Sequence, residues 1–274
     1  MARSLLIIAL AHLVIAAHRD LHWVHPGCHE WLQQKGLHPS AIRSQDAYQQ
    51  TMDPCRGGIQ GAWKGHEPCM LLMHPPPELP QSMLNRSRVY ANRHLALKGE
   101  VTRGSSVVEV GTFAGSLARF MLHRLRPSQL AVIDVDEDAI GKCHNKTAAR
   151  SQQIAGQRLT KVTCLLGRSE QVLATLDDAS WDLIYIDSSH TYPGTCMELE
   201  LAFRKITLGG LIVVNDYFTV EPPNPANQPP DFWNVYGVIH ATNEFALRHK
   251  HDLEVAYYAL GSQNLGDLAL RRLK

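Results

Sequence analysis

The sequence predicts an α/β fold: a doubly wound, seven-stranded, mostly parallel sheet with an antiparallel last strand, preceded by an N-terminal extension. Two observations support this prediction. From about residue 81 onwards, short apolar segments alternate with longer helical ones, as in a parallel sheet covered by helices on both faces. Near the end of the chain, two apolar segments are separated by only a short turn, so they must pair antiparallel.

The individual elements follow from the same periodicity. Short apolar segments bounded by turn residues predict strands, and longer periodic segments predict helices. The expected strands are Ser106–Val110, Leu130–Asp134, Val162–Leu166, Leu183–Asp187, Leu211–Asp216, Leu253–Leu260 and Asp267–Arg272. The expected helices are Leu84–Leu97, Ser116–Leu125, Glu137–Ala155, Ser169–Leu176, Gly194–Lys205 and Tyr236–Lys250. Gly99 ends the first helix, and a Pro-rich loop, Glu221–Pro230, precedes the last one.

Composition narrows the class of protein. The chain has 274 residues, of which 45% are hydrophobic, so it is long and apolar enough to bury a core. Its 27 basic and 26 acidic residues leave a formal net charge of +1, which argues against a general nucleic-acid binder. No apolar run reaches the roughly 18 residues of a membrane-spanning helix. These numbers favour a globular protein with a small-molecule partner, and they leave room for a homo-oligomer.

The N-terminus has the layout of a secretory signal peptide, predicted here over residues 1–17. Arg3 is followed by an apolar run, Leu5–Ala17, that ends in small residues before a polar segment. The alternative is a buried N-terminal helix. Two glycosylation sequons, beginning at Asn85 and Asn145, agree with a secretory route. We therefore expect a protein of the secretory pathway or a secreted one, or a cytoplasmic one if the segment is not a signal.

Residues 18–80 form a predicted Cys/His/Pro-rich extension ahead of an α/β domain at 81–274. The six cysteines could pair in an oxidising lumen, although sequence alone does not reveal the connectivity. Cys164 lies in an expected core strand, which favours a buried thiol. The spacings His25-x-x-Cys28-His29 and His66-x-x-Cys69 suggest zinc, but the lack of a second Cys-x-x-Cys pair argues against it.

A glycine turn follows the first expected strand. Gly111 and Gly115 allow a close backbone approach to a ligand, and the next helix begins with free N–H groups. Asp134 ends the second strand, where an acidic side chain can bind ribose hydroxyls. A nucleoside ligand without phosphates, such as S-adenosylmethionine, suits this arrangement. The absence of a Gly-x-Gly-x-x-Gly motif counts against a dehydrogenase.

Three motifs then carry a family resemblance. VVEVGTFAGS at 107–116 resembles the first motif of catechol and caffeoyl-CoA O-methyltransferases. IDSSHTYPG at 186–194, followed by LGGLIVVNDY at 208–217, resembles the macrolide and cephalosporin-pathway O-methyltransferases. The segment at 236–238 and the closing strands also match. From about Leu84 to Arg272, the chain is thus similar to class I S-adenosylmethionine-dependent methyltransferases, which implies a Rossmann-like fold.

The resemblance implies roles for individual residues. Glu109, Gly111 and Gly115 would surround the methionine end of S-adenosylmethionine, Thr112 would also bind the cofactor, and Asp134 would hold the ribose. Ser169 and Glu170 would lie at the adenine, and Asp187 would also border the cofactor.

The same resemblance implies a metal and a base. Asp187, Asn215 and Asp216 end neighbouring strands and would offer three oxygens to Mg²⁺, next to the sulfonium methyl. His190 stands where the family's base is found, with Asp187 as its catalytic neighbour. Asn215 departs from the acid usual in the macrolide-type enzymes, which would weaken metal binding. The alternative is that the two aspartates are helix caps or cofactor-side residues, as in metal-free relatives.

The sequence therefore predicts a Mg²⁺-assisted O-methyltransferase for a small hydroxylated molecule, with His190 as base. Two alternatives stay open: a metal-free methyltransferase, and a non-catalytic secreted Rossmann-like binding protein. Tyr192 and Tyr217 would either contact the methyl acceptor or pack beside the strand ends.

Overall fold

The computed structural model describes residues 76–148, 160–217, 220–221, 234–261 and 266–274. The chain divides into two compact units, one of residues 1–76 and 219–235 and one of residues 77–218 and 236–274. In the first unit, the described residues include one short antiparallel pair, β7 (Val220–Glu221) with β8 (Asn234–Val235). The predicted signal peptide and most of the predicted extension lie outside the described residues. All that follows concerns the second unit.

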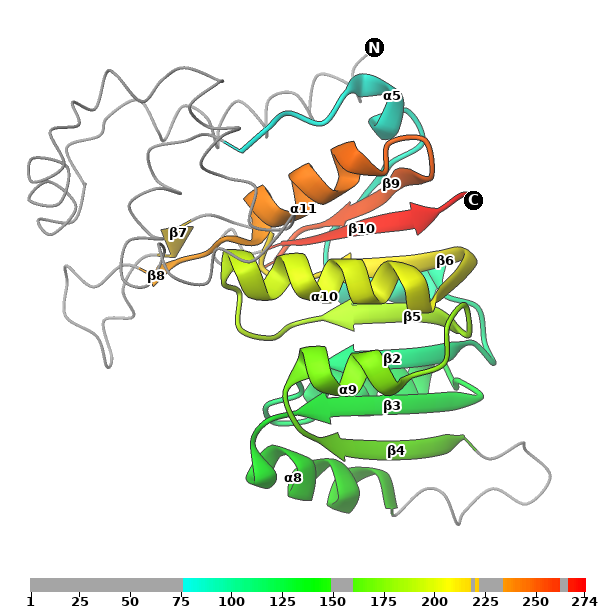
Figure 1. Ribbon diagram of the computed structural model, residues 1–274. Helices are drawn as coiled ribbons and strands as arrows, with labels where there is room; N and C mark the ends of the chain where they lie inside the picture. Colours follow the sequence, from blue (N-terminus) through cyan, green and yellow to red (C-terminus); the bar gives the residue numbers. More distant parts are fainter. Residues whose placement is uncertain (1–75, 149–159, 218–219, 222–233, 262–265) are drawn as a thin grey trace, which may run out of the picture. The chain divides into compact units, whose positions relative to one another are not determined.

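The second unit contains an eight-stranded sheet in the order β1-β9-β10-β6-β5-β2-β3-β4 (Figure 1). Only β10 runs antiparallel to its neighbours, β6 and β9. The strands are β1 (Arg88–Tyr90), β2 (Ser106–Val110), β3 (Gln129–Asp134), β4 (Lys161–Leu166), β5 (Trp181–Ile186), β6 (Ile206–Val214), β9 (Leu253–Ala259) and β10 (Asp267–Arg272). The predicted doubly wound, mostly parallel fold with an antiparallel last strand is confirmed.

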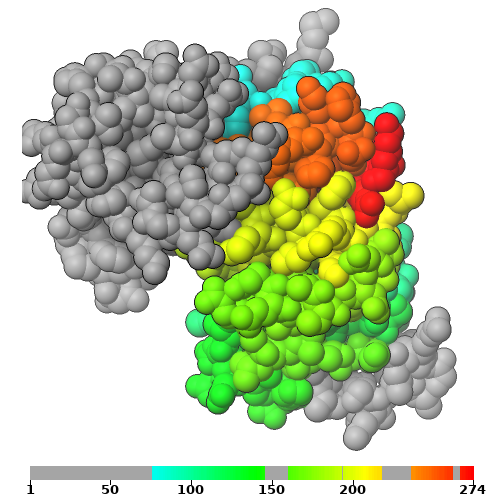
Figure 2. Space-filling view, viewed as in Figure 1, coloured from blue at the N-terminus to red at the C-terminus, as the bar shows by residue number. Residues whose placement is uncertain are grey.

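Helices cover both faces of this sheet. They are α5 (Gln81–Leu84), α6 (Arg93–Glu100), α7 (Ser116–Arg124), α8 (Glu137–Ala148), α9 (Ser169–Thr175), α10 (Tyr192–Lys205) and α11 (Val238–Arg248). On one face, side chains of α6, α7 and α8 pack with alternate strand residues into a core that includes Leu97, Met121 and Leu183. On the other face, α10 and α11 lie side by side (Figure 2). No helix in the described parts of the chain is long and apolar enough to cross a membrane.

The prediction of a single helix at Leu84–Leu97 was wrong. Part of this segment forms the eighth strand of the sheet. The structure divides this stretch into α5, β1 and α6. Arg88–Tyr90 pairs in parallel with β9, so an edge position in the sheet overrides local helical preference. The side chain of Asn92 accepts a hydrogen bond from the Leu95 N–H at 3.0 Å and starts α6 anew. The other expected elements are present, with ends shifted by a few residues, and the last residues of the expected helix Glu137–Ala155 lie outside the described residues.

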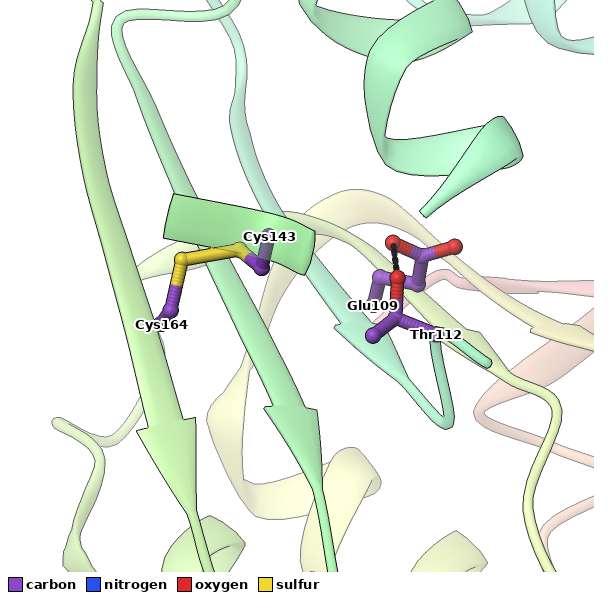
Figure 3. Close-up of a disulfide and its surroundings, with 4 residues drawn as sticks. All are labelled: Glu109, Thr112, Cys143 and Cys164. Atoms are coloured by element: carbon purple, nitrogen blue, oxygen red, sulfur yellow. Dashed lines mark hydrogen bonds between the residues drawn. A yellow bond between two sulfur atoms is a disulfide. The ribbon is translucent and has the colours of Figure 1, made fainter. Parts of the chain in front are cut away.

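A disulfide joins Cys143 of α8 to Cys164 of β4 (Figure 3). The expectation that Cys164 is a buried thiol was therefore wrong. The physical reason is its place on an edge strand: Cys164 is only partly buried and packs against the helix face that carries the buried Cys143. Cys196 is buried on α10, and the remaining three cysteines lie outside the described residues.

The disulfide is expected to stabilise the domain. It closes a loop with a sequence separation of 21, and loop-closure entropy predicts a loss of about 3 kcal/mol in the free energy of unfolding when it is reduced. Urea denaturation of the wild type with and without dithiothreitol measures this loss. The variant Cys143→Ser serves as control, because dithiothreitol should not change its midpoint through this bond. A wild type whose midpoint ignores the reductant contradicts the expectation.

Candidate functional site

The glycine turn lies between β2 and α7. Gly111 has a φ of 82°, and a Cβ there would lie 1.8 Å from the carbonyl oxygen of Asp187. No other residue can occupy this position without moving the end of β5. Gly115, with a φ of 67°, precedes the first residue of α7. The turn therefore brings bare backbone to the carboxyl edge of the sheet, as predicted from the sequence.

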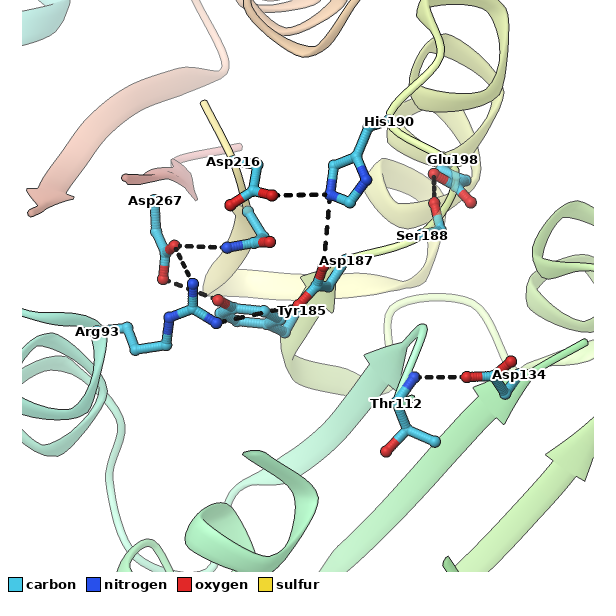
Figure 4. Close-up of polar contacts among 11 residues, drawn as sticks. Arg93, Thr112, Asp134, Tyr185, Asp187, Ser188, His190, Glu198, Asp216 and Asp267 are labelled. Carbon is cyan, nitrogen blue, oxygen red and sulfur yellow. Dashed lines mark hydrogen bonds and ion pairs between the residues drawn. The ribbon is translucent and has the colours of Figure 1, made fainter. Parts of the chain in front are cut away.

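Asp134 holds this turn in place. Its Oδ2 accepts hydrogen bonds from the N–H groups of Thr112 at 2.8 Å and Phe113 at 3.0 Å (Figure 4). Partial burial pushes its pKa up, but backbone donors, first Asp136 and then the two turn residues, lower the pKa below its ordinary value. Asp134 is thus an ionised carboxylate at the end of β3, where the sequence placed it.

Glu109 lies beneath the turn. Its side chain is buried, and its Oε2 accepts a hydrogen bond from the Thr112 hydroxyl at 3.1 Å (Figure 3). Burial raises its pKa to about 8, so the carboxyl is largely protonated at neutral pH. Both residues are covered by protein, so they support the turn from below.

Ser169 and Glu170 begin α9, shortly after β4 ends at Leu166. Leu166 pairs with Asp134 in the sheet, so both residues lie beyond the same strand edge as the ribose candidate. Ser169 is half-buried, and Glu170 forms an ion pair with Arg168.

Three exposed apolar side chains at this edge were missed by the sequence analysis. Phe113, Val135 and Leu166 are 83%, 67% and 51% exposed, and they follow or end the neighbouring strands β2, β3 and β4. Large exposed apolar groups at three adjacent strand ends offer a surface for a flat, apolar part of a ligand. The signal available in the sequence was an apolar residue placed directly after a strand-ending acid, as at Val135.

A second cluster lies at the ends of β5 and β6. The Nε2 atom of His190 is 3.4 Å from Oδ1 of Asp187 and 3.6 Å from Oδ2 of Asp216 (Figure 4). Asn215 directly precedes Asp216 and is buried. The structure thus brings together all four residues that the sequence singled out. His190 and Asp216 have φ values of 55° and 50°, a region that costs non-glycine residues of order 1 kcal/mol or more and is common at functional sites.

The charges in this cluster depend on one another. Burial pushes the pKa of His190 down, but hydrogen bonding and charge attraction from Asp187, and then the charge of Asp216, raise it above the ordinary value. Burial raises the pKa of Asp216 to about 6, against the opposing charge of His190. The protonation of His190 and that of Asp216 therefore depend on each other.

Asp267, at the start of β10, anchors the cluster from behind. Its nearly inaccessible carboxylate accepts hydrogen bonds from Asn215 Nδ2 at 3.0 Å and Tyr185 Oη at 2.8 Å (Figure 4). Arg93 of α6 lies 3.5 Å from Asp267 and 4.0 Å from Asp187. Asp267 was not predicted from the sequence, although its place opposite β6 follows once the closing strands are paired. No pattern in the sequence indicated that Arg93 would reach this cluster.

Tyr192 and Tyr217 pack against α11. Their hydroxyl groups each donate a hydrogen bond of 2.5 Å, to Glu244 and Asn243 respectively. This geometry favours the packing role that the sequence left open for them.

The hydrogen bond to Asp267 gives residue 215 a structural reason to be an amide. Asn215→Asp would set two carboxylates against each other in a buried place, so we expect a loss of about 1–3 kcal/mol in the free energy of unfolding at pH 7. Urea denaturation measures it. The double variant Asn215→Asp/Asp267→Asn restores a donor–acceptor pair and should recover most of the loss. Full stability in the single variant would show that the pair does not determine residue 215.

Comparison with known proteins agrees with this architecture. A family model described as a methyltransferase domain matches residues 108–217. A Mycolicibacterium smegmatis protein named "Putative O-methyltransferase" is 32% identical over 123 residues, which are 44% of this chain and 55% of that protein. A Mycobacterium tuberculosis protein of the same name is also 32% identical over 123 residues, 44% of this chain and 51% of its own length. The chain thus spans about half the length of the curated relatives it matches.

Among solved structures, a protein from Methanosarcina mazei described as a SAM-dependent methyltransferase has a TM-score of 0.49 and 13% identity, covering 66% of this chain and 99% of its own. The match to the methyltransferase domain includes both the glycine turn and the cluster of Asp187, His190 and Asp216, so this part of the chain is similar to methyltransferase domains, and its curated relatives are named as O-methyltransferases.

Proposed function

We propose that this protein methylates a hydroxyl group of a small molecule, with S-adenosylmethionine as methyl donor and His190 as base. The observation that carries the proposal is the position of His190 Nε2, held between the carboxylates of Asp187 and Asp216 at the same sheet edge as the glycine turn. The O-methyltransferase relatives support the choice of oxygen as the accepting atom. These relatives are matched over only about half their length. The identity of the methyl-accepting molecule is therefore proposed from the chemistry of the site.

The residues at the edge of β2, β3 and β4 fit S-adenosylmethionine. Gly111 lets the turn pass directly against the Asp187 carbonyl, and the N-terminus of α7 begins just beyond the turn. Asp134 is ionised and suited to the ribose hydroxyls, and the exposed Val135 and Leu166 suit the adenine ring. Ser169 and Glu170 would border the adenine, Gly115 and Asp187 the methionine end, and Glu109 and Thr112 would support the turn. When bound, the cofactor supplies an electrophilic methyl group on a sulfonium sulfur.

The chain's own residues then prepare the acceptor. Neutral His190 can take the hydroxyl proton at Nε2 as the oxygen approaches the methyl group. Asp187 and Asp216 stabilise the imidazolium that forms, because each lies within ion-pair distance of that nitrogen. Holding acceptor and base at one sheet edge converts an encounter in solution into a reaction between positioned groups.

Magnesium assistance, predicted from the sequence, does not fit the side chains as they are arranged. The His190 Nε2 stands between the carboxylates that would bind the ion. Among the described residues, no group of three or more His, Cys, Asp or Glu is placed to hold a metal. A Mg²⁺ ion bound by Asp187, Asn215 and Asp216 would require His190 to move out, so no step above is routed through it.

Secretion remains a proposal based on the predicted signal peptide at 1–17. The Cys143–Cys164 disulfide supports it, because disulfides persist mainly in oxidising compartments. The alternative is a non-catalytic binding protein. It predicts that the wild type binds the cofactor but transfers no methyl group.

Cofactor binding can be tested at the ribose position. Asp134→Ala should raise the dissociation constant for S-adenosylmethionine about tenfold or more, because hydrogen bonds to a charged group are lost. Isothermal titration calorimetry measures the constant. Asp136→Ala, an exposed acid two residues further on, is the matched control and should bind like the wild type. Absence of binding to the wild type would refute the cofactor assignment.

The role of His190 predicts a loss of activity and a pH dependence. His190→Gln should lower kcat by about 10²–10⁴-fold while leaving cofactor affinity unchanged. A base must be unprotonated, and the pKa of His190 is raised, so wild-type activity should increase with pH through a midpoint above the ordinary histidine value. Transfer of radiolabelled methyl groups to catechol and other small hydroxylated molecules measures both. A variant as active as the wild type would exclude His190 as base.

The same assay decides the metal question. With the arrangement described above, methyl transfer should persist after treatment with EDTA. Activity that is lost on chelation and restored by Mg²⁺ would instead support the metal-assisted reaction predicted from the sequence.

A further inference from the structure

His190 has an unusual backbone conformation, which contacts with the surrounding structure must stabilise. Its φ of 55° lies in the left-handed region, which the surrounding structure must enforce in a residue other than glycine. On one side, the preceding loop is anchored by Ser188, whose hydroxyl donates to the buried Glu198 at 2.6 Å (Figure 4). That bond fixes the chain between Asp187 and His190 but does not touch the imidazole.

Two residues just before α11 contact His190 directly. The ring of Tyr236 lies with its centroid 5.0 Å from that of the imidazole, at an interplanar angle of 32°. This is the range of offset aromatic packing. The next residue, Gly237, donates its backbone N–H to the carbonyl oxygen of His190 at 2.9 Å. One dipeptide therefore contacts both the side chain and the main chain of the proposed base.

The contact requires glycine at 237. A Cβ at this position would lie 2.2 Å from the backbone nitrogen of Tyr192 and 2.4 Å from its Cα, so any side chain would push the loop away. The same two elements are joined a second time, because Tyr192 Oη donates to Glu244 of α11 at 2.5 Å. The start of α11 is thus docked closely onto the segment that carries His190.

We propose that Tyr236 and Gly237 are positioning residues for His190: the ring packed on the imidazole and the backbone bond to its carbonyl hold Nε2 between Asp187 and Asp216. The inference rests on the proposed function for its effect on turnover. The stacked ring limits rotation of the imidazole, and the backbone bond maintains the left-handed conformation that aims it. Neither residue needs to touch the reacting atoms.

The experiment compares Tyr236→Phe with Tyr236→Leu in the full chain. Tyr236→Phe keeps the ring and should keep the wild-type turnover of the hydroxylated molecule that accepts methyl groups in the radiolabel assay. Tyr236→Leu should lower kcat about 10- to 100-fold through misplacement of the base. Its dissociation constant for S-adenosylmethionine should not change. Tyr90→Leu, which removes a half-buried ring at the far edge of the sheet, is the control and should leave kcat unchanged.

A second measurement does not depend on catalysis. In ¹H–¹³C spectra of histidine-labelled protein, the ring protons of His190, identified by their loss in His190→Gln, should carry a ring-current shift. Tyr236→Leu should remove this shift and Tyr236→Phe should retain it. Gly237→Ala should also move these resonances, because the loop must yield to the new Cβ.

The outcomes separate the two proposals. Wild-type kcat in Tyr236→Leu, or His190 resonances that do not respond to it, overturns the positioning role. If the wild type transfers no methyl group while the resonances shift as expected, the proposed function fails and the contact between Tyr236 and His190 is supported.

Discussion

The contact between the glycine turn after β2 and the end of β5 is the constraint on which the site depends. The backbone of Gly111 lies so close to the Asp187 carbonyl that even a methyl group cannot be inserted. Beside it, the Asp187 N–H donates to the Val110 carbonyl at 2.7 Å, and the Asn215 N–H donates to the Ile186 carbonyl at 2.9 Å. Main-chain contacts thereby join three strand ends, so the backbone alone fixes the separation between the glycine turn and the cluster of Asp187, His190 and Asp216.

The sequence could predict the parts of the fold that depend on local pattern. Buried parallel strands are continuous apolar runs, which is why Ser106–Val110 and the strands that follow it are readable without a structure. Arg88–Tyr90 was not, because its strand conformation comes from pairing with β9, about 170 residues further along the chain. The Cys143–Cys164 bond was missed for a similar reason: its geometry depends on how α8 packs on an edge strand.

Some residues of the candidate site could likewise be predicted from the sequence, and others could not. Asp187, His190 and Asp216 could be found because the ends of parallel strands gather at one edge, so position in the chain implies proximity in space. Arg93, Asp267 and Tyr236 reach the cluster from segments whose approach only tertiary packing determines. Sequence reasoning therefore recovered the groups proposed to react and missed those that hold them in place.

The left-handed backbone at His190 and Asp216 means that this domain is locally less stable than it could be. Glycine would adopt these conformations without steric cost, yet both positions carry the side chains that the cluster needs. The energy stored there is compensated by the well-packed remainder of the sheet. At these two positions the backbone favours glycine, whereas the proposed chemistry uses the residues that the chain carries.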